Sequence, residues 1–153
     1  MKQVRGVGLF LLNKEGRFYA IKELVSKRGA VCKNPGDLSI PLETLDPEEN
    51  HKAGVARLFK EEIDAYDVLK VTEPLYIGEY VSREKHLLTA VSLYVSFIIK
   101  ADCLVFAGSH AGTEYEPHGF VSEEELIRKG RQGTSDLFRV WKFYHDEDIW
   151  GGG

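Results

Sequence analysis

Apolar and polar residues alternate most regularly over residues 87–99, where every second position is apolar or threonine. A period of two is typical of a β-strand that buries one face. The length of this run predicts a central, bent strand. The apolar residues 75–81 predict another strand just before it.

The start of the chain predicts a β-hairpin. Residues 4–12 are rich in strand-forming side chains, Asn-Lys-Glu-Gly at 13–16 is typical of a turn, and residues 17–21 continue the strand pattern. A polar loop then leads to the short apolar run 38–40. A further short strand is predicted at residues 103–106.

Capping signals and helical periodicity predict three helices. Asp46 is a suitable N-cap before Pro47, and Glu49 completes a capping box, so the first helix is expected to begin at Pro47. A second capping box at 122–125 opens a short helix that Gly130 is expected to end. The third helix is marked by apolar residues at i, i+3, i+4 and i+7, namely Leu137, Val140, Trp141 and Tyr144.

This order of strands and helices predicts an α+β domain with a mixed sheet between helical layers. The chain of 153 residues, 43% apolar and 29% charged, is typical of one globular domain over residues 1–150, with a flexible C-terminal tail at 151–153. The longest apolar stretch is too short to cross a membrane, and the N-terminus does not resemble a secretory signal. The two cysteines form neither a disulfide framework nor a zinc pattern, and a cytoplasmic location is expected. The net charge of −4 argues against a broad basic surface for nucleic acid.

The candidate chemistry gathers between residues 41 and 65. Glu49 is followed after seven residues by Arg57 and, after three more, by the pair Glu61 and Glu62. Paired carboxylates next to an arginine on a helix are a means of holding a hard divalent cation against a diphosphate.

This spacing resembles the signature of the Nudix family, G-x5-E-x7-R-E-U-x-E-E-x-G-U, where U is a bulky aliphatic residue. Three positions differ from it, because Glu43 replaces the first glycine, Leu58 the glutamate after the arginine, and Asp64 the last glycine. The resemblance covers nearly the whole chain. It implies a Nudix-like α/β/α sandwich with a mixed β-sheet between helices.

The resemblance also implies an activity and a set of partners. The expected protein is a Mg²⁺- or Mn²⁺-dependent pyrophosphohydrolase that acts on a nucleoside diphosphate linked to another group. The expected partner is therefore a small nucleotide diphosphate substrate, with no membrane partner, and a homodimer is left open.

The same resemblance implies site residues. Glu61 and Glu62 are expected to bind the metal, together with the backbone carbonyl of Leu42. Arg57 lies one helical turn before Glu61 and is expected to orient it through a salt bridge; direct contact with phosphate is the alternative. Glu49 has two interpretations. In a continuous helix from residue 47 it would lie roughly 18 Å from Glu61 and act only as a cap, whereas a later helix start would bring it into the box.

The loop before the second helix is expected to supply a further carboxylate, and Glu116 is the predicted catalytic residue, with Glu114 as the alternative. Lys27, Arg28 and Lys33 are candidates for phosphate contacts, with a solvated loop as the alternative. Tyr115 is a weaker candidate for stacking on a base and His118 for a substrate hydrogen bond, and the remaining histidines form no recognisable cluster.

Two functions follow. The metal-dependent hydrolase is favoured by the retained Arg57, Glu61 and Glu62. A Nudix-like nucleotide-binding or regulatory module without turnover is favoured by Leu58, Glu43 and Asp64, the three departures from the signature. Leu58 removes a negative charge from the expected metal site, and packing in the core is its alternative role.

Overall fold

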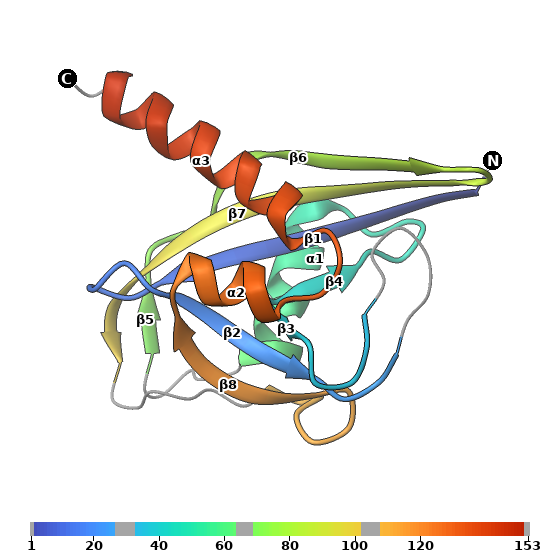
Figure 1. The fold of residues 1–153 in the computed structure, drawn as a ribbon, viewed down its shortest axis with the longest axis horizontal. Coiled ribbons are helices and arrows are strands. Elements are labelled where there is room, and N and C mark those ends of the chain that lie inside the picture. Colours follow the sequence, from blue (N-terminus) through green and yellow to red (C-terminus); the bar gives the residue numbers. More distant parts are fainter. Residues whose placement is uncertain (1, 27–32, 64–68, 102–107, 152–153) are drawn as a thin grey trace.

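The computed structural model describes residues 2–26, 33–63, 69–101 and 108–151, and the described strands form a mixed sheet between helices (Figure 1). The strands are β1 (Lys2–Leu12), β2 (Phe18–Glu23), β3 (Leu38–Ser39), β4 (Leu42–Thr44), β5 (Leu69–Val71), β6 (Leu75–Glu84), β7 (Leu87–Ala101) and β8 (Tyr115–Val121). The helices are α1 (His51–Leu58) with a π-helical turn η1 (Phe59–Ile63), α2 (Glu123–Lys129) and α3 (Thr134–Gly151).

The sheet is built around β1. The order β3-β2-β1-β7-β5 runs across it, while β4 pairs with β1, β6 with β7, and β8 with β2. The pair β1–β7 is parallel, and the other strand pairs are antiparallel. This arrangement places β4 and α1, the segment of the candidate chemistry, directly against β1.

Side chains of β1 alternate between two apolar cores because successive residues of a strand face opposite sides. Leu9 and Leu11 pack with Val55 and Leu58 of α1, whereas Phe10 packs on the opposite side with residues of α2 and α3. The helices therefore cover both faces of the sheet (Figure 1). The predicted α/β/α sandwich is confirmed.

Most of the predicted elements are present. The hairpin β1–β2 has Leu12 opposite Phe18, and β6 and β7 match the alternating runs. Ser122 caps α2 by accepting a hydrogen bond from the N–H of Glu125, and Gly130 is the C-cap. The sequence did not predict β4, β5 or β8, and the strand expected at 103–106 lies outside the described residues. Of the expected tail, Gly151 is the last residue of α3, and 152–153 are not described.

The predicted start of the first helix is wrong. The helix α1 begins at His51, and its N-cap is Asn50, which accepts a hydrogen bond of 2.8 Å from the N–H of Ala53. Residues 46–49 form a turn instead, with the N–H of Glu49 donating to the carbonyl of Asp46. The Arg5 side chain holds this turn against β1 by donating to the carbonyls of residues 46, 47 and 49.

Within the described ranges, the helices are too short or too polar to span a bilayer. The expected cytoplasmic location stays a prediction.

Candidate active site

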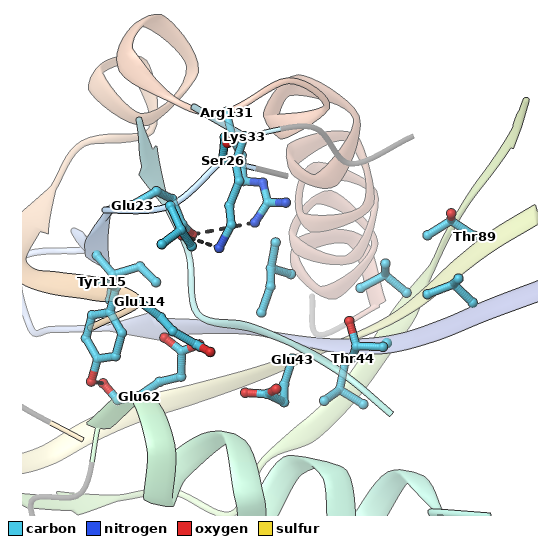
Figure 2. Close-up of a pocket in the computed structure, with 17 residues that line it drawn as sticks. Glu23, Ser26, Lys33, Glu43, Thr44, Glu62, Thr89, Glu114, Tyr115 and Arg131 are labelled. Carbon is cyan, nitrogen blue, oxygen red and sulfur yellow. Dashed lines mark hydrogen bonds and ion pairs between the residues drawn. The ribbon is translucent and has the colours of Figure 1, made fainter. Parts of the chain in front are cut away.

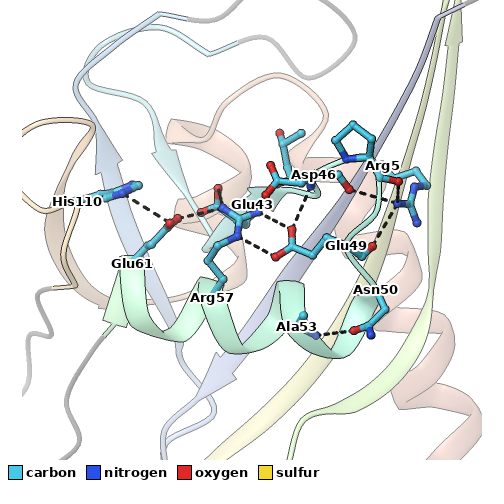
Figure 3. A network of polar contacts seen from close by, with 11 residues as sticks. Arg5, Glu43, Asp46, Glu49, Asn50, Ala53, Arg57, Glu61 and His110 are labelled. Atoms are coloured by element: carbon cyan, nitrogen blue, oxygen red, sulfur yellow. Dashed lines mark hydrogen bonds and ion pairs between the residues drawn. The ribbon is translucent and has the colours of Figure 1, made fainter.

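Arg57 is the centre of an ionic network in which it contacts three carboxylates (Figure 3). Its guanidinium donates to both carboxylate oxygens of Glu49, at 2.8 and 3.0 Å. One of its terminal nitrogens also lies 3.0 Å from Glu43 and 3.3 Å from Glu61. The expected pairing of Arg57 with Glu61 is confirmed. The hydrogen bonds that Arg57 donates to Glu49 are the main reason that the pKa of Arg57 is raised.

The later start of α1 resolves the two interpretations of Glu49. Because the chain turns before the helix, Glu49 folds back onto Arg57 and joins the network. Its side chain still caps the turn by accepting from the N–H of Asp46. The hydrogen bonds from Arg57 and then from Asp46 lower the pKa of Glu49 to about 2, so Glu49 is a stable anion that holds Arg57 in place.

Glu43 behaves differently from Glu49 although both touch Arg57. Burial, followed by a hydrogen bond and charge repulsion from Glu61, raises the pKa of Glu43 to about 8. Two neighbouring carboxyl groups resist joint ionisation, so this pair holds a proton near neutral pH. A cation placed beside the pair would favour release of that proton.

Glu62 lines a cleft to which Glu43 also contributes (Figure 2). It is 6% exposed, and its Oε2 is a buried oxygen without a hydrogen-bond partner among the described residues. Burial raises the pKa of Glu62 well above its usual value, and the charges of Glu43 and Glu23 add to the effect.

Tyr115 fixes the π-helical turn that carries both glutamates. Its hydroxyl lies 3.1 and 2.9 Å from the carbonyls of Glu61 and Glu62, and it accepts a hydrogen bond from the N–H of Gly108. The hydroxyl proton serves one carbonyl at a time, so the two carbonyls share it. Tyr115 is 1% exposed, which excludes the suggested stacking on a base.

The cleft has a volume of about 350 Å³ and lies between η1, β4, the end of β2 and the segment after α2. Figure 2 shows Glu43, Glu62 and Glu114 toward one end, and Glu23, Lys33 and Arg131 toward the other. Apolar side chains also line the cleft, among them Val7, Ile21, Leu42 and Val91. The cleft can therefore hold a ligand with both charged and apolar parts.

Solved structures with a similar fold include Nudix hydrolases. A MutT Nudix hydrolase from Burkholderia pseudomallei is 14% identical and has a TM-score of 0.67, with 92% of this chain and 98% of that one covered. A Nudix hydrolase from Nitrosomonas europaea is 16% identical with a TM-score of 0.64 over 95% and 90% of the two chains. A MutT protein from Methanosarcina mazei Go1 is 19% identical with a TM-score of 0.63 over 95% of each. The chain has the Nudix fold. No family model and no curated protein matches its sequence.

Within this Nudix fold, the predicted catalytic residue Glu116 is not placed at the site. Glu116 is exposed on β8, opposite Lys22 of β2, and among the described residues that line the cleft its neighbour Glu114 is present and Glu116 is not. The reason is the alternation of the strand: Tyr115 faces inward, so Glu116 faces outward. His118 is also exposed and outside the cleft lining.

His110 is a neighbour of the box that the sequence did not reveal. Its Nδ1 lies 3.1 Å from Glu114, and its Nε2 lies 3.6 Å from Glu61. The backbone N–H of His110 also donates a hydrogen bond to the backbone carbonyl of Glu61. No spacing in the sequence links residue 110 to residue 61, so only the folded chain brings them together.

Leu58 and Leu42 are the two apolar residues that the sequence comparison singled out near the acidic residues. Leu58 is fully buried beside Val55 and Ile63, so it contributes to the core and not to the cleft. Leu42 lines the cleft and lies opposite Gly8 in the β1–β4 pairing. Hydrogen bonds to β1 are made by the carbonyl of Pro41, so the next carbonyl, that of Leu42, points away from β1.

The residues present fit a cation at one place in the cleft. Within the described ranges, no three acidic, histidine or cysteine side chains converge as a preformed metal centre. Glu62 nevertheless offers a buried oxygen without a hydrogen-bond partner in the part of the chain that the structure describes, and the pKa of Glu43 beside Glu61 is raised. Carboxylate oxygens of this kind suit Mg²⁺ or Mn²⁺, which complete their shells with water.

Proposed function

We propose that this protein is a divalent-metal-dependent hydrolase that cleaves the diphosphate bond of a nucleoside diphosphate linked to another group. The observation that carries this proposal is the buried carboxylate of Glu62, which faces the cleft with an oxygen that has no protein partner among the described residues. Burying an unpartnered carboxylate is costly, so such a group is retained where a ligand compensates it.

Each residue of the site would have a distinct task. Glu62 would be the main ligand of a Mg²⁺ or Mn²⁺ ion, with Glu61 and the carbonyl of Leu42 as further candidates. The ion would neutralise the charge of the diphosphate. Arg57 would act as a positioning residue, because its three ion pairs fix Glu61 and Glu43.

Glu114 is the better candidate for the general base. It lines the cleft on the same side as Glu62, and its carboxylate contacts His110. In the hydrolysis, water attacks one phosphorus atom, the bond to the bridging oxygen breaks, and the bond electrons leave with the second phosphate. Glu114 would take the proton of the attacking water.

The test is product formation from a panel of nucleoside diphosphate-linked compounds, with and without Mg²⁺ or Mn²⁺. We expect metal-dependent turnover in the wild type and a loss of at least about 100-fold in Glu62→Gln, on the order of 2.7 kcal/mol of barrier. The matched control is Glu116→Gln, which removes an exposed carboxylate outside the cleft and should retain activity. Equal Mn²⁺ binding by the wild type and Glu62→Gln in calorimetry would overturn the metal site.

The second candidate, a nucleotide-binding or regulatory module without turnover, is favoured by Leu58. Because Leu58 lies in the core, the box has one carboxylate fewer than the Nudix signature provides. Metal-dependent binding of a nucleotide without any product would support this function over the hydrolase.

A further inference from the structure

We propose that β6 is a self-complementary edge strand, through which two copies of this chain pair into a symmetric dimer with the twofold axis at Val81. In this dimer Glu79 of each copy lies opposite Arg83 of the other. The inference goes beyond the proposed hydrolase and does not depend on it, because the described residues that line the cleft include none from β6.

The strand β6 lies at an edge of the described sheet. It pairs with β7 on one side, and no described strand pairs with its other side (Figure 1). An edge strand presents a row of backbone N–H and C=O groups that can pair with another chain. The strand Leu75–Glu84 contains no proline, so every residue of it keeps its backbone N–H.

The regular part of β6 has Val81 at its centre. The pairing of β6 with β7 is irregular between Tyr76 and Gly78, and the strand ends at Glu84. The uninterrupted segment is therefore 78–84, and Val81 is its midpoint. Antiparallel pairing of this segment with a second copy about Val81 would use its full length.

The two faces of β6 differ in their surroundings. Tyr80 is partly buried against the core to which α3 contributes. Because successive side chains of a strand face opposite sides, Glu79, Val81 and Arg83 share the other face. All three are exposed, and 53% of Val81 is accessible to solvent. This face is therefore open to a partner.

The charges on the open face are arranged symmetrically about Val81. Glu79 lies two residues before it and Arg83 two residues after it, and no ion pair joins either charge to another described residue. The two are roughly 13 Å apart along the strand, too far to pair within one chain. Their neighbours on β7 are Ser92 and Leu88, which carry no charge. The described sheet thus supplies no counter-ion to either residue.

A second copy would supply both counter-ions. In antiparallel pairing about Val81, Glu79 lies directly opposite Arg83 of the second copy, on the same face, and the reverse pair forms on the other side of the axis. Directly opposite side chains have Cβ atoms about 4.5–5.5 Å apart, which suits an ion pair. An axis at Glu79 or at Arg83 would instead place like charges opposite each other. The charge pattern therefore favours the axis at Val81.

Solvent is the alternative occupant of this face, because charged side chains also protect edge strands from pairing. In that case Glu79 and Arg83 act separately, and the chain is a monomer. A symmetric interface, by contrast, repeats each contact twice and closes both free edges, so it gives a dimer and no larger assembly.

The test is the self-association of the intact chain, measured by sedimentation equilibrium at low and at high ionic strength. We expect a wild-type dimer that weakens at high ionic strength, because salt screens exposed charges. Glu79→Arg and Arg83→Glu each place two pairs of like charges across the axis. Each should raise the dissociation constant of the dimer at least about tenfold.

Restoring the charge complementarity should restore the dimer. The double variant with both changes only exchanges the charges within each pair, so it should dimerise like the wild type. An equimolar mixture of the two single variants should form heterodimers, because one chain has two arginines where the other has two glutamates. Damage to the fold by either change would not be reversed by mixing.

The matched control is Glu73→Arg, which makes the same charge change at an exposed position before β6 and should keep the wild-type dissociation constant. Val81→Lys is an independent variant that places two like charges at the axis and should also dissociate the dimer. Melting temperatures show whether each variant is folded. If a charge variant melts below the assay temperature, Val81→Lys makes the same test.

A wild type that stays monomeric at every concentration overturns the proposal, and so does an open-ended assembly. The proposal is also overturned if Val81→Lys or both charge variants dimerise as tightly as the wild type. Failure of both the mixture and the double variant to regain the dimer would refute the pairing of Glu79 with Arg83. Each of these outcomes leaves the hydrolase intact, and a dimer without turnover would refute only the hydrolase.

Discussion

Replacing Leu58 by glutamate would restore the charge pattern of the Nudix signature, yet we expect Leu58→Glu to destabilise the protein without activating it. Leu58 is fully buried and packs with Val55 and Ile63 between α1 and the sheet. The introduced carboxyl group would therefore enter the apolar core. It would not reach the cleft that Glu62 faces.

The size of the effect follows from this burial. Truncating a buried leucine costs about 2–5 kcal/mol, and a buried polar group without a partner adds about 1–3 kcal/mol. A total of roughly 3–8 kcal/mol is a large part of the 5–15 kcal/mol by which domains are typically stable. At about 2–4 °C for each kcal/mol, the melting temperature should fall by at least about 6 °C.

The assay combines thermal unfolding with Mn²⁺ titration. The matched control is Leu58→Met, which conserves volume and should cost less than about 1.5 kcal/mol. Burial would raise the pKa of the introduced carboxyl group in the folded state. Its neutral form is then favoured at low pH. The loss of melting temperature in Leu58→Glu, relative to the wild type, should therefore grow as pH rises above about 4.3, the usual pKa of glutamate.

A different outcome would refute the reasoning. If Leu58→Glu melts within about 2 °C of the wild type and binds Mn²⁺ more tightly, residue 58 faces the metal site and its assignment to the core is wrong. Equal deficits for Leu58→Glu at pH 5 and pH 8 would contradict burial of the carboxyl group.

Three further variants test other parts of the site. Because the pKa of Glu43 is raised, its stabilising contribution is complete below pH 4.5 and is lost as pH rises through about 8. Glu43→Gln should therefore flatten the dependence of melting temperature on pH in this window. An unchanged slope would contradict this prediction. Tyr115→Phe removes the hydroxyl between Gly108 and the carbonyls of η1 and should lower the free energy of unfolding by about 1–3 kcal/mol in urea titration; a wild-type value would show that this contact is dispensable. Glu114→Gln should lower kcat at least tenfold, about 1.4 kcal/mol of barrier, with little change in melting temperature, while Glu116→Gln should not; the reverse result would return the catalytic role to Glu116.

Local patterns in the sequence were sufficient for much of the fold. The turn at 13–16 closes the β1–β2 hairpin, and the alternation over 87–99 coincides with β7. Ser122 and Gly130 are the N-cap and C-cap of α2, as expected, because capping residues act within one helical turn and need no distant partner.

The start of α1 required the tertiary structure. Asp46, Pro47 and Glu49 form a plausible helix start by themselves, but Arg5 of β1 binds the carbonyls of this segment and holds it as a turn. As a result, Glu49 reaches Arg57 instead of lying far from the box.

The sequence by itself determined which charged residues form the box and that they occupy the segment after the first hairpin. The role of each residue depended on whether its side chain faces the cleft, the core or solvent. Packing between distant segments buries Leu58 and brings His110 close to Glu61. It also turns Tyr115 inward, which leaves Glu116 outside the cleft. A linear pattern records spacing along one element, whereas the side of an element that faces the cleft is fixed by what packs against its other side.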